Sequence, residues 1–220
     1  MTDWRYVAVE GPIGVGKTTL ARRLAETWSA DLLLEAPEEN PFLGAFYDQP
    51  AANALPAQLF FLLQRARQTE TLRQRDLFHQ RRITDFMFEK DPLFARLTLS
   101  GPEWTLYEDI YTRLAWQAPA PDKLIYLYAP RDTLMSRVRQ RARPEEHNLD
   151  PDYLARVIES YAAYFSHYQD APLVTVNAEQ MDLVGNDEDY QRLLAALDSP
   201  ARRVDLPGPA LAMTNRPEVL

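Results

Sequence analysis

The sequence contains no cysteine and only seven glycines among its 220 residues. The absence of cysteine excludes a disulfide framework and a thiolate metal site. No apolar run approaches the ~18 residues of a membrane-spanning helix, and the first residues, MTDWRYVAVEG, form no charged-then-apolar leader. A net charge of −8 and a pI near 5.0 disfavour a protein whose main partner is a nucleic acid or a membrane. We therefore expect a cytoplasmic enzyme that binds neither.

Three of the seven glycines lie in the short stretch GPIGVGKTT, which matches the phosphate-binding pattern G-x-x-x-x-G-K-[ST]. The apolar run 6–9 before it predicts a buried strand, and residues 18–28 predict a helix, which is the setting that the pattern requires. Backbone N–H groups and the helix N-terminus would surround an anion, while a hydroxyl binds Mg²⁺. We expect the phosphates of a nucleotide to be bound by Gly11, Gly14, Gly16, Lys17, Thr18 and Thr19.

Five short apolar runs alternate with segments of helical period, and they cover residues 6–9, 32–34, 82–84, 124–128 and 173–176. This alternation predicts an α/β fold with a five-stranded parallel sheet and helices on both faces. We expect one domain over residues 1–198. Residues 199–220 contain four prolines and no clear periodicity, which predicts an irregular tail.

Two carboxylates follow expected strands, where ligands of parallel sheets bind. Glu35 follows the second strand and Asp85 follows the third. Phosphoryl transfer to an alcohol needs oxygen ligands for Mg²⁺ and a base that accepts the proton of the alcohol. Both residues are candidates for these tasks, although acidic residues after strands also serve as plain loop residues or helix caps.

Arginines are concentrated in the segment TLMSRVRQRARPEEH. On a helix, Arg137 and Arg141 share one face, while Arg139 and Arg143 share another. Guanidinium groups on a mobile lid would neutralise charge on a transferring phosphoryl group and exclude water. The other interpretation is a solvated helix face.

Taken together, these residues resemble the deoxyribonucleoside kinase family, and the likeness runs from about residue 6 to residue 197. It is carried by GPIGVGKTT, by LLLEAPEENPFLGAFY after the second strand and by the lid-like RVRQRARPEEH. The resemblance implies a P-loop kinase fold with an arginine-rich lid, and most closely the bacterial deoxyadenosine and deoxyguanosine kinase type. It also implies a homodimer, for which segments 58–75 and 106–116 could serve.

The resemblance assigns roles to individual residues. Glu35 would be the general base, assisted by Lys17 and Arg141, and Mg²⁺ would be held with the help of Thr18 and Asp85. The arginines implied to contact ATP are Arg137, Arg141 and Arg143. The residues implied to bind the nucleoside are Glu35, Tyr47, Gln58, Arg65, Asp91 and Glu146.

The sequence departs from the family at two places. Family members usually carry an acid-arginine-serine triplet after the third strand, whereas here the triplet is Asp85-Phe86-Met87. From its spacing of four residues, we predict that Lys90 supplies the charge missing at Phe86. Ala142 replaces a glycine between two lid arginines, which should only stiffen that segment.

The resulting prediction is an enzyme that phosphorylates the 5′-hydroxyl of a purine deoxyribonucleoside with ATP and Mg²⁺, for deoxynucleotide salvage. One alternative is a thymidylate-type nucleoside monophosphate kinase, which should show an arginine near the third strand's end; Phe86 argues against it. The other is a non-catalytic nucleotide-binding switch. A guanine-reading Asn-Lys-x-Asp loop, which a switch GTPase needs, is absent from the sequence.

Overall fold

The computed structural model describes residues 4–74, 81–115 and 118–207. Within these ranges the strands are β1 (Tyr6–Glu10), β2 (Asp31–Leu33), β3 (Arg82–Thr84), β4 (Lys123–Tyr128), β5 (Leu173–Asn177) and β6 (Arg203–Leu206). The α-helices are α1 (Lys17–Trp28), α2 (Leu43–Asp48), α3 (Pro50–Gln74), α4 (Asp91–Thr98), α5 (Gly101–Ala115), α6 (Arg131–Arg141), α7 (Pro151–Ser166) and α8 (Asp187–Asp198). Short 3₁₀ helices cover Pro37–Glu39, Phe88–Lys90 and Pro144–Glu146.

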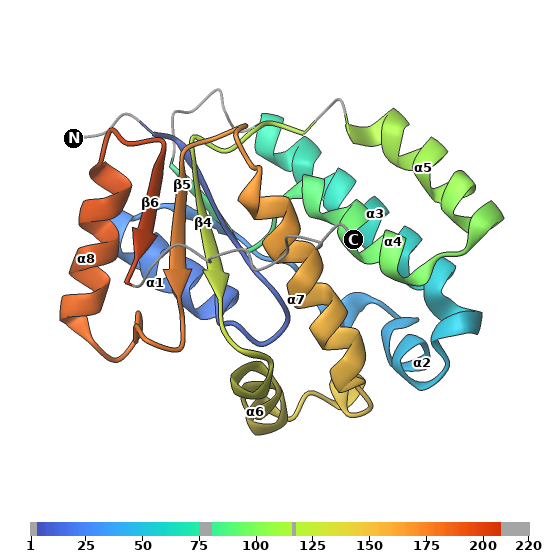
Figure 1. Ribbon diagram of the computed structural model, residues 1–220. Coiled ribbons are helices and arrows are strands. Elements are labelled where there is room, and N and C mark those ends of the chain that lie inside the picture. The colour runs from blue at the N-terminus through green and yellow to red at the C-terminus, as the bar shows by residue number, and fades with distance from the viewer. Residues whose placement is uncertain (1–3, 75–80, 116–117, 208–220) are drawn as a thin grey trace, which may run out of the picture.

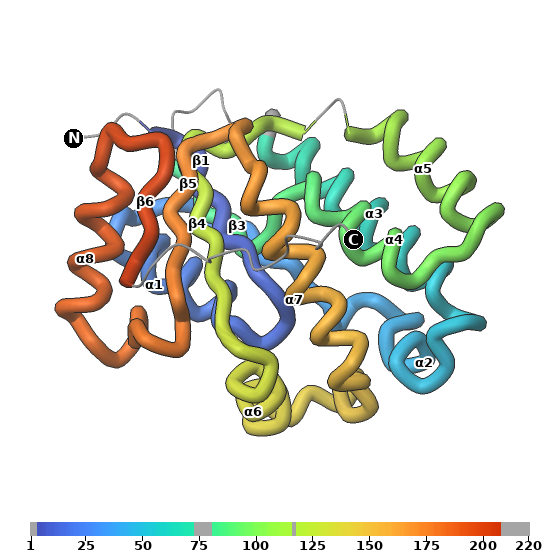
Figure 2. Tube along the Cα trace, in the orientation of Figure 1, coloured from blue at the N-terminus to red at the C-terminus, as the bar shows by residue number. Residues whose placement is uncertain are grey.

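The strands form one parallel sheet in the order β2-β3-β1-β4-β5-β6 (Figure 1). The predicted α/β fold is therefore confirmed. The strand that carries the glycine loop, β1, lies between β3 and β4, so the loop emerges near the middle of the sheet. In Figure 2, α6 lies beyond the carboxyl end of β4, on the side where the loop emerges.

The predicted number of strands was wrong, because the described chain forms six rather than five. The additional strand, β6, belongs to the segment expected to be irregular, and it pairs with β5 from Leu173 opposite Arg203 to Val176 opposite Leu206. It is a four-residue edge strand with polar residues at alternate positions, so it produces no apolar run. Residues 208–220 of the expected tail lie outside the described residues.

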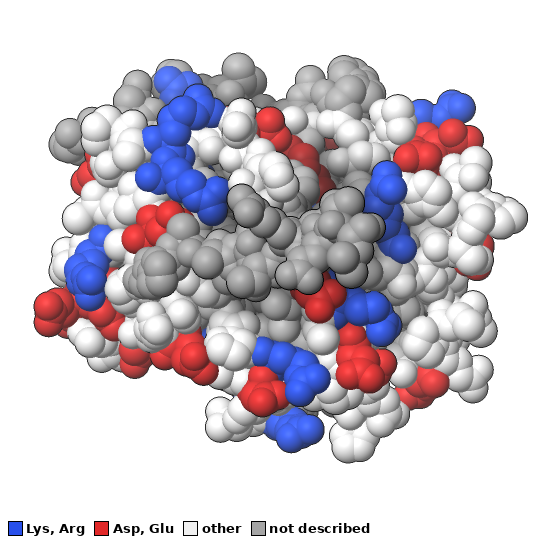
Figure 3. All heavy atoms as spheres, in the orientation of Figure 1, with Lys and Arg blue, Asp and Glu red and all other residues white. Residues whose placement is uncertain are grey.

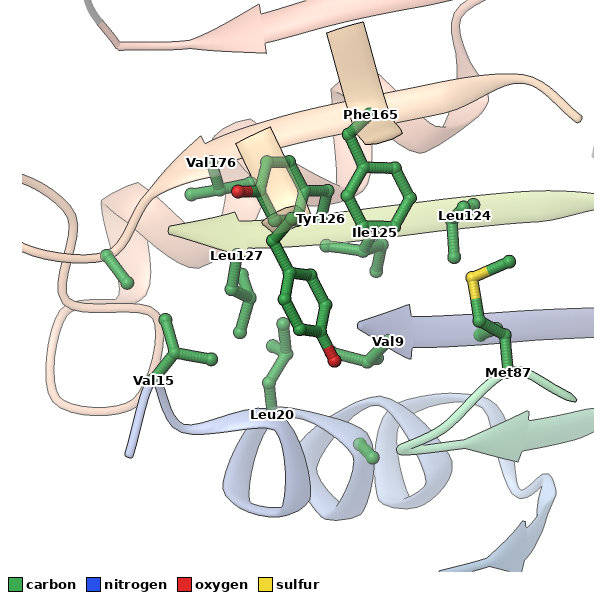
Figure 4. Packing of buried hydrophobic residues seen from close by; sticks show 14 of the residues in the cluster. Val9, Val15, Leu20, Met87, Leu124, Ile125, Tyr126, Leu127, Phe165 and Val176 are labelled. Atoms are coloured by element: carbon green, nitrogen blue, oxygen red, sulfur yellow. The ribbon is translucent and has the colours of Figure 1, made fainter. Parts of the chain in front are cut away.

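Helices cover both faces of the sheet, as predicted. On one face α1 packs beside α8, where the Thr27 hydroxyl lies 2.6 Å from the Tyr190 hydroxyl. On the other face the ring of Phe165 in α7 stacks 4.2 Å from the ring of Tyr126 in β4. Figure 4 shows Leu20 of α1 and Phe165 of α7 on opposite sides of the central strands.

Side chains that accept hydrogen bonds from free helix N–H groups fix the starts of the last two helices. The Asp150 carboxylate accepts from the Asp152 amide at 3.0 Å, with Pro151 at the first position of α7. The Asn186 side chain accepts from the Glu188 amide at 2.9 Å at the start of α8. None of the helices in the described ranges has both the length and the apolar composition to cross a bilayer.

Candidate active site

The glycine loop between β1 and α1 is shaped by close backbone contacts that exclude side chains. Gly11 has a φ of +152°, and a Cβ there would lie 2.3 Å from the Leu127 carbonyl oxygen. Gly14 has a φ of +84°, and its Cβ would lie 2.9 Å from the Leu134 carbonyl oxygen. The turn ends at Gly16, and no side chain caps the first N–H groups of α1. These groups are free to bind an anion.

The two functional side chains after this loop point to different partners. The Lys17 ammonium donates to the carbonyl oxygens of Gly11 at 2.7 Å and Pro12 at 3.2 Å. Burial, with a smaller contribution from the neighbouring Lys90 charge, lowers the pKa of Lys17 to about 8. The Thr18 hydroxyl donates to Asp85 Oδ2 at 2.5 Å.

Thr18 and Asp85 together fit the requirements of Mg²⁺. This ion takes one or two protein oxygens and completes its octahedron with phosphate and water oxygens. A hydroxyl and a carboxylate already in contact at the start of α1 supply that number. No group of three or more His, Asp or Glu side chains suited to a metal occurs in residues 4–74, 81–115 and 118–207.

Glu35 lies two residues beyond β2, between two positive charges. Its carboxylate contacts the Arg65 guanidinium through one oxygen and accepts from Lys90 Nζ at 3.2 Å through the other. Burial by itself would raise the pKa of Glu35, but the charges of Arg65, Lys90 and Lys17 outweigh it and lower the pKa to about 2. Glu35 is therefore a carboxylate at neutral pH and can accept a hydrogen bond from an alcohol.

The backbone around Glu35 is held by contacts that the sequence analysis missed. On α3, Gln64 Nε2 donates to the Ala36 carbonyl at 3.2 Å, and Gln68 Nε2 donates to the Leu34 carbonyl at 2.8 Å. From the other side, Asp85 Oδ1 accepts from the Glu35 amide at 2.7 Å. The signal available in the sequence was the spacing of the two glutamines, four residues apart on one helix face.

Glu35 opens onto a pocket between the glycine loop, α2, α3 and the lid. The pocket spans about 840 Å³ including its open mouth. Five of the predicted nucleoside-binding residues line it, and the sixth, Asp91, contacts the Arg65 guanidinium next to it. The lining residues from the prediction are Glu35, Tyr47, Gln58, Arg65 and Glu146.

The wall of the pocket carries buried polar groups. Gln58 and Arg65 are buried side chains that line it, and Arg65 Nε has no hydrogen-bond partner. Asp91 Oδ2, behind Arg65, is also buried without a partner. Buried polar groups are normally paired, so this end of the pocket suits a ligand with polar edges. Aromatic rings, among them Phe61 and Phe94, form much of the remaining wall and suit a flat apolar group.

The arginines of the expected lid lie on two sides of the glycine loop. Arg141 Nε donates to Glu146 Oε2 at 2.8 Å in a two-point pair, and Arg143 lies 4.0 Å from Glu38 Oε2; both arginines line the pocket of Glu35. Arg137 donates to the Ala178 carbonyl at 2.7 Å. With Thr19 and Gly16 it lines a second hollow beyond α1.

Three features define a P-loop phosphotransferase. They are a glycine loop with an uncapped helix start, a hydroxyl paired with a carboxylate, and a second carboxylate that faces a ligand pocket. The sequence model of the deoxynucleoside kinase family matches residues 7–200, and the chain belongs to this family. This confirms the resemblance and identifies the protein as an enzyme of the kinase class.

Individual relatives are similar over most of their length. A deoxyguanosine kinase of Bacillus subtilis (strain 168) is 34% identical over 195 residues, covering 86% of this chain and 94% of the relative. A deoxyadenosine kinase of Lactobacillus acidophilus is 26% identical over 214 residues, which cover 91% of this chain and 98% of the relative. The structure of a deoxyadenosine kinase from M. mycoides with bound dATP superimposes with a TM-score of 0.77 at 23% identity, over 89% of this chain and 100% of that one, which supports the fold.

Proposed function

We propose that this enzyme transfers the γ-phosphate of ATP to the 5′-hydroxyl of a deoxyribonucleoside. The observation that carries the proposal is that the Glu35 carboxylate shares one pocket with Lys17 and Thr18 of the glycine loop. A phosphate donor and an alcohol would thus meet at a single carboxylate. Salvage of deoxynucleosides in the cytoplasm is the physiological setting that this reaction fits.

In the proposed reaction Glu35 accepts the proton of the 5′-hydroxyl, and the oxygen attacks the γ-phosphorus in line. The bond from the γ-phosphorus to its bridging oxygen breaks, ADP leaves, and the proton passes from Glu35 to water. Lys17 and Arg141 neutralise the charge that spreads over the transferring group. When bound, Mg²⁺ would add further neutralisation of the phosphate oxygens near Thr18 and Asp85.

The charges of the pocket favour a neutral acceptor over a nucleoside monophosphate. Each arginine that lines the pocket faces a carboxylate, and so does Lys90. A substrate phosphate would need an uncommitted cation at the acceptor end of the pocket. This distribution argues against the thymidylate-type alternative, and the family match argues against a non-catalytic switch.

The nucleoside would be selected by hydrogen bonds at both ends. Tyr47 and Glu146 would hold the sugar 3′-hydroxyl, while Gln58, Arg65 and Asp91 would read the base edge. Arg65 Nε offers a buried donor and Asp91 Oδ2 a buried acceptor, and a base without complementary groups would leave them unpaired. The names of the relatives, deoxyguanosine and deoxyadenosine kinase, favour a purine.

The rest of ATP would occupy the second hollow, against Gly16, Thr19 and Arg137.

We infer no nucleic-acid partner. On the face shown in Figure 3, lysine and arginine side chains are interspersed with acidic ones rather than gathered in one basic patch. We infer a homodimer formed through α3 and α5. These helices contain the two predicted dimer segments except for Arg75 and Trp116, which lie outside the described residues.

The test is a panel of the four deoxynucleosides with ATP and Mg²⁺, comparing wild type, Glu35→Gln and the control Glu26→Gln on the exposed side of α1. We expect Glu35→Gln to lower kcat at least ~100-fold, the range of a lost general base, with nucleoside binding retained in calorimetry. The control should keep wild-type kcat.

Three results would contradict the proposal. Full activity of Glu35→Gln would remove the base assignment. Transfer to dTMP but to none of the deoxynucleosides would establish the monophosphate kinase alternative, and thermal stabilisation by GTP alone, without transfer, would establish the switch.

A further inference from the structure

Lys90 is a buried cation placed between two carboxylates. Its ammonium lies 3.2 Å from Glu35 Oε2 and 3.6 Å from Glu10 Oε1, and only 2% of its surface is exposed. Lysine is almost never buried to this extent unless it is paired. Both carboxylates therefore belong to the environment that keeps this charge inside the protein.

Glu10, the last residue of β1, is fixed by three separate parts of the chain. Its Oε1 accepts from the Gly11 amide at 3.0 Å and the Tyr161 hydroxyl at 2.9 Å, and its Oε2 accepts from the Met87 amide at 2.9 Å. The donors come from the glycine loop, from α7 and from the segment after β3. With every oxygen bonded and no exposed surface, Glu10 is a rigid anchor for Lys90.

We propose that Lys90, anchored by Glu10, is a positioning residue that holds the Glu35 carboxylate next to the glycine loop. This inference rests on the proposed function, since it concerns the placement of the base. Arg65 contacts one oxygen of Glu35 from α3, and Lys90 contacts the other oxygen from the 3₁₀ helix Phe88–Lys90. The two cations therefore fix both oxygens of the carboxylate. Without the ammonium, Glu10 and Glu35 would be two like charges facing each other in a buried site, and Glu35 would be displaced.

The surroundings of Phe86 agree with this role for Lys90. Phe86 is 1% exposed and is not among the described residues that line the pocket, whereas Lys90 is. The positive charge beside Glu35 on this side therefore comes from Lys90, at the end of the 3₁₀ helix Phe88–Lys90.

The test compares Lys90→Met, which removes the charge but keeps the length, with Lys90→Arg, which keeps the charge. We expect Lys90→Met to lower kcat about 100-fold, the loss caused by a misplacement of about 1 Å, with smaller changes in both KM values. Lys90→Arg should recover most of kcat. Lys123→Met is the matched control, because Lys123 is a partly buried lysine that donates to the Ser199 carbonyl, at 3.0 Å, at the other end of the sheet.

Two further measurements separate positioning from a purely structural role. In Lys90→Ala, ethylammonium should restore kcat in a saturable way, while ethanol should not. Because Glu10 acts through Lys90, the double variant Glu10→Gln/Lys90→Met should lose no more kcat than Lys90→Met alone.

Wild-type kcat in Lys90→Met would overturn the inference, as would a loss that follows the thermal unfolding midpoint and is not rescued by ethylammonium. If Glu35→Gln is inactive and Lys90→Met is fully active, this inference fails and the proposed function stands. If both variants are fully active, the base assignment itself has failed.

Discussion

At the scale of single residues, Lys17 is a lysine whose pKa is lowered far enough for its charge to change under mildly alkaline conditions. Its ammonium is bonded to carbonyl oxygens of its own loop, and burial with the nearby Lys90 charge lowers its pKa to about 8. A lysine loses its charge as the pH rises through its pKa. The free enzyme therefore loses its phosphate-binding ammonium above pH 8, well below the ordinary pKa of a lysine.

We predict that kcat/KM for ATP falls as the pH rises above about 8, because this ratio reports the free enzyme. Bound phosphates stabilise the ammonium, so kcat should fall only at higher pH. Lys17→Arg provides the control: its guanidinium stays charged, and its lower kcat/KM should not fall near pH 8. A wild-type kcat/KM that is flat to pH 9.5 would contradict the assignment of this pKa.

The residues around Glu35 show what sequence reasoning could and could not reach. The prediction selected Glu35 and Asp85 from their positions after expected strands and Arg65 from the family resemblance, and the structure brings all three together. It missed Gln64 and Gln68, because their spacing shows only that they share a helix face, and the carbonyl oxygens to which they donate cannot be identified from the sequence. Contacts to the backbone depend on how α3 packs against the loop after β2, and only the fold shows this packing.

At the scale of elements, the end of α6 is strained. Ala142 follows the last helical residue with a φ of +47°, a conformation that favours glycine, and its amide donates to the Val138 carbonyl at 3.2 Å. The expectation that alanine here only stiffens the segment was therefore incomplete. The left-handed conformation costs an alanine roughly 1–2 kcal/mol.

We predict that Ala142→Gly raises the free energy of unfolding by about 1 kcal/mol, since the relieved strain exceeds the entropy that glycine adds to the unfolded chain. Ala163→Gly, at an exposed position within α7, is the control and should lower the free energy of unfolding by about 1 kcal/mol. Urea titration of the three proteins measures both changes. Equal destabilisation by both substitutions would show that Ala142 is not strained in solution.

At the scale of the whole molecule, α3, α4 and α5 lie side by side (Figure 1), and most side chains of α5 are not buried. Tyr107 is the one buried residue among the fifteen of α5. Leu106 on α5 is 48% exposed and Leu63 on α3 is 45% exposed. Large apolar side chains left in water on neighbouring helices are the feature on which the proposed dimer rests.

We predict that Leu106→Glu shifts the protein from dimer to monomer, because a carboxylate at the interface would lose its hydration without gaining a partner. Light scattering after size exclusion measures the mass. Val184→Glu, at an equally exposed position before α8, is the control and should leave the mass unchanged. A wild-type protein that elutes as a monomer at high concentration would refute the dimer.

Most of the fold could be predicted because the central strands β1, β4 and β5 are continuous apolar runs, which is the pattern of strands buried on both faces. The edge strand β6 could not. Arg203 is exposed and the other three side chains are only half-buried, so the sequence of β6 does not differ from that of a polar tail. Pairing with β5, a contact between segments about thirty residues apart, decides its conformation.

The row of alternating charges from Glu10 through Lys90, Glu35 and Arg65 to Asp91 has a consequence for enzyme engineering. Arg65 contacts both Glu35, the proposed base, and Asp91, the carboxylate that would recognise the nucleobase. Substrate selectivity and turnover therefore both depend on this side chain. Redesign of substrate preference at Arg65 would slow the chemistry as well. Gln58 lines the same cavity and forms no ion pair in the described part of the chain, so it is the better position at which to change the accepted base.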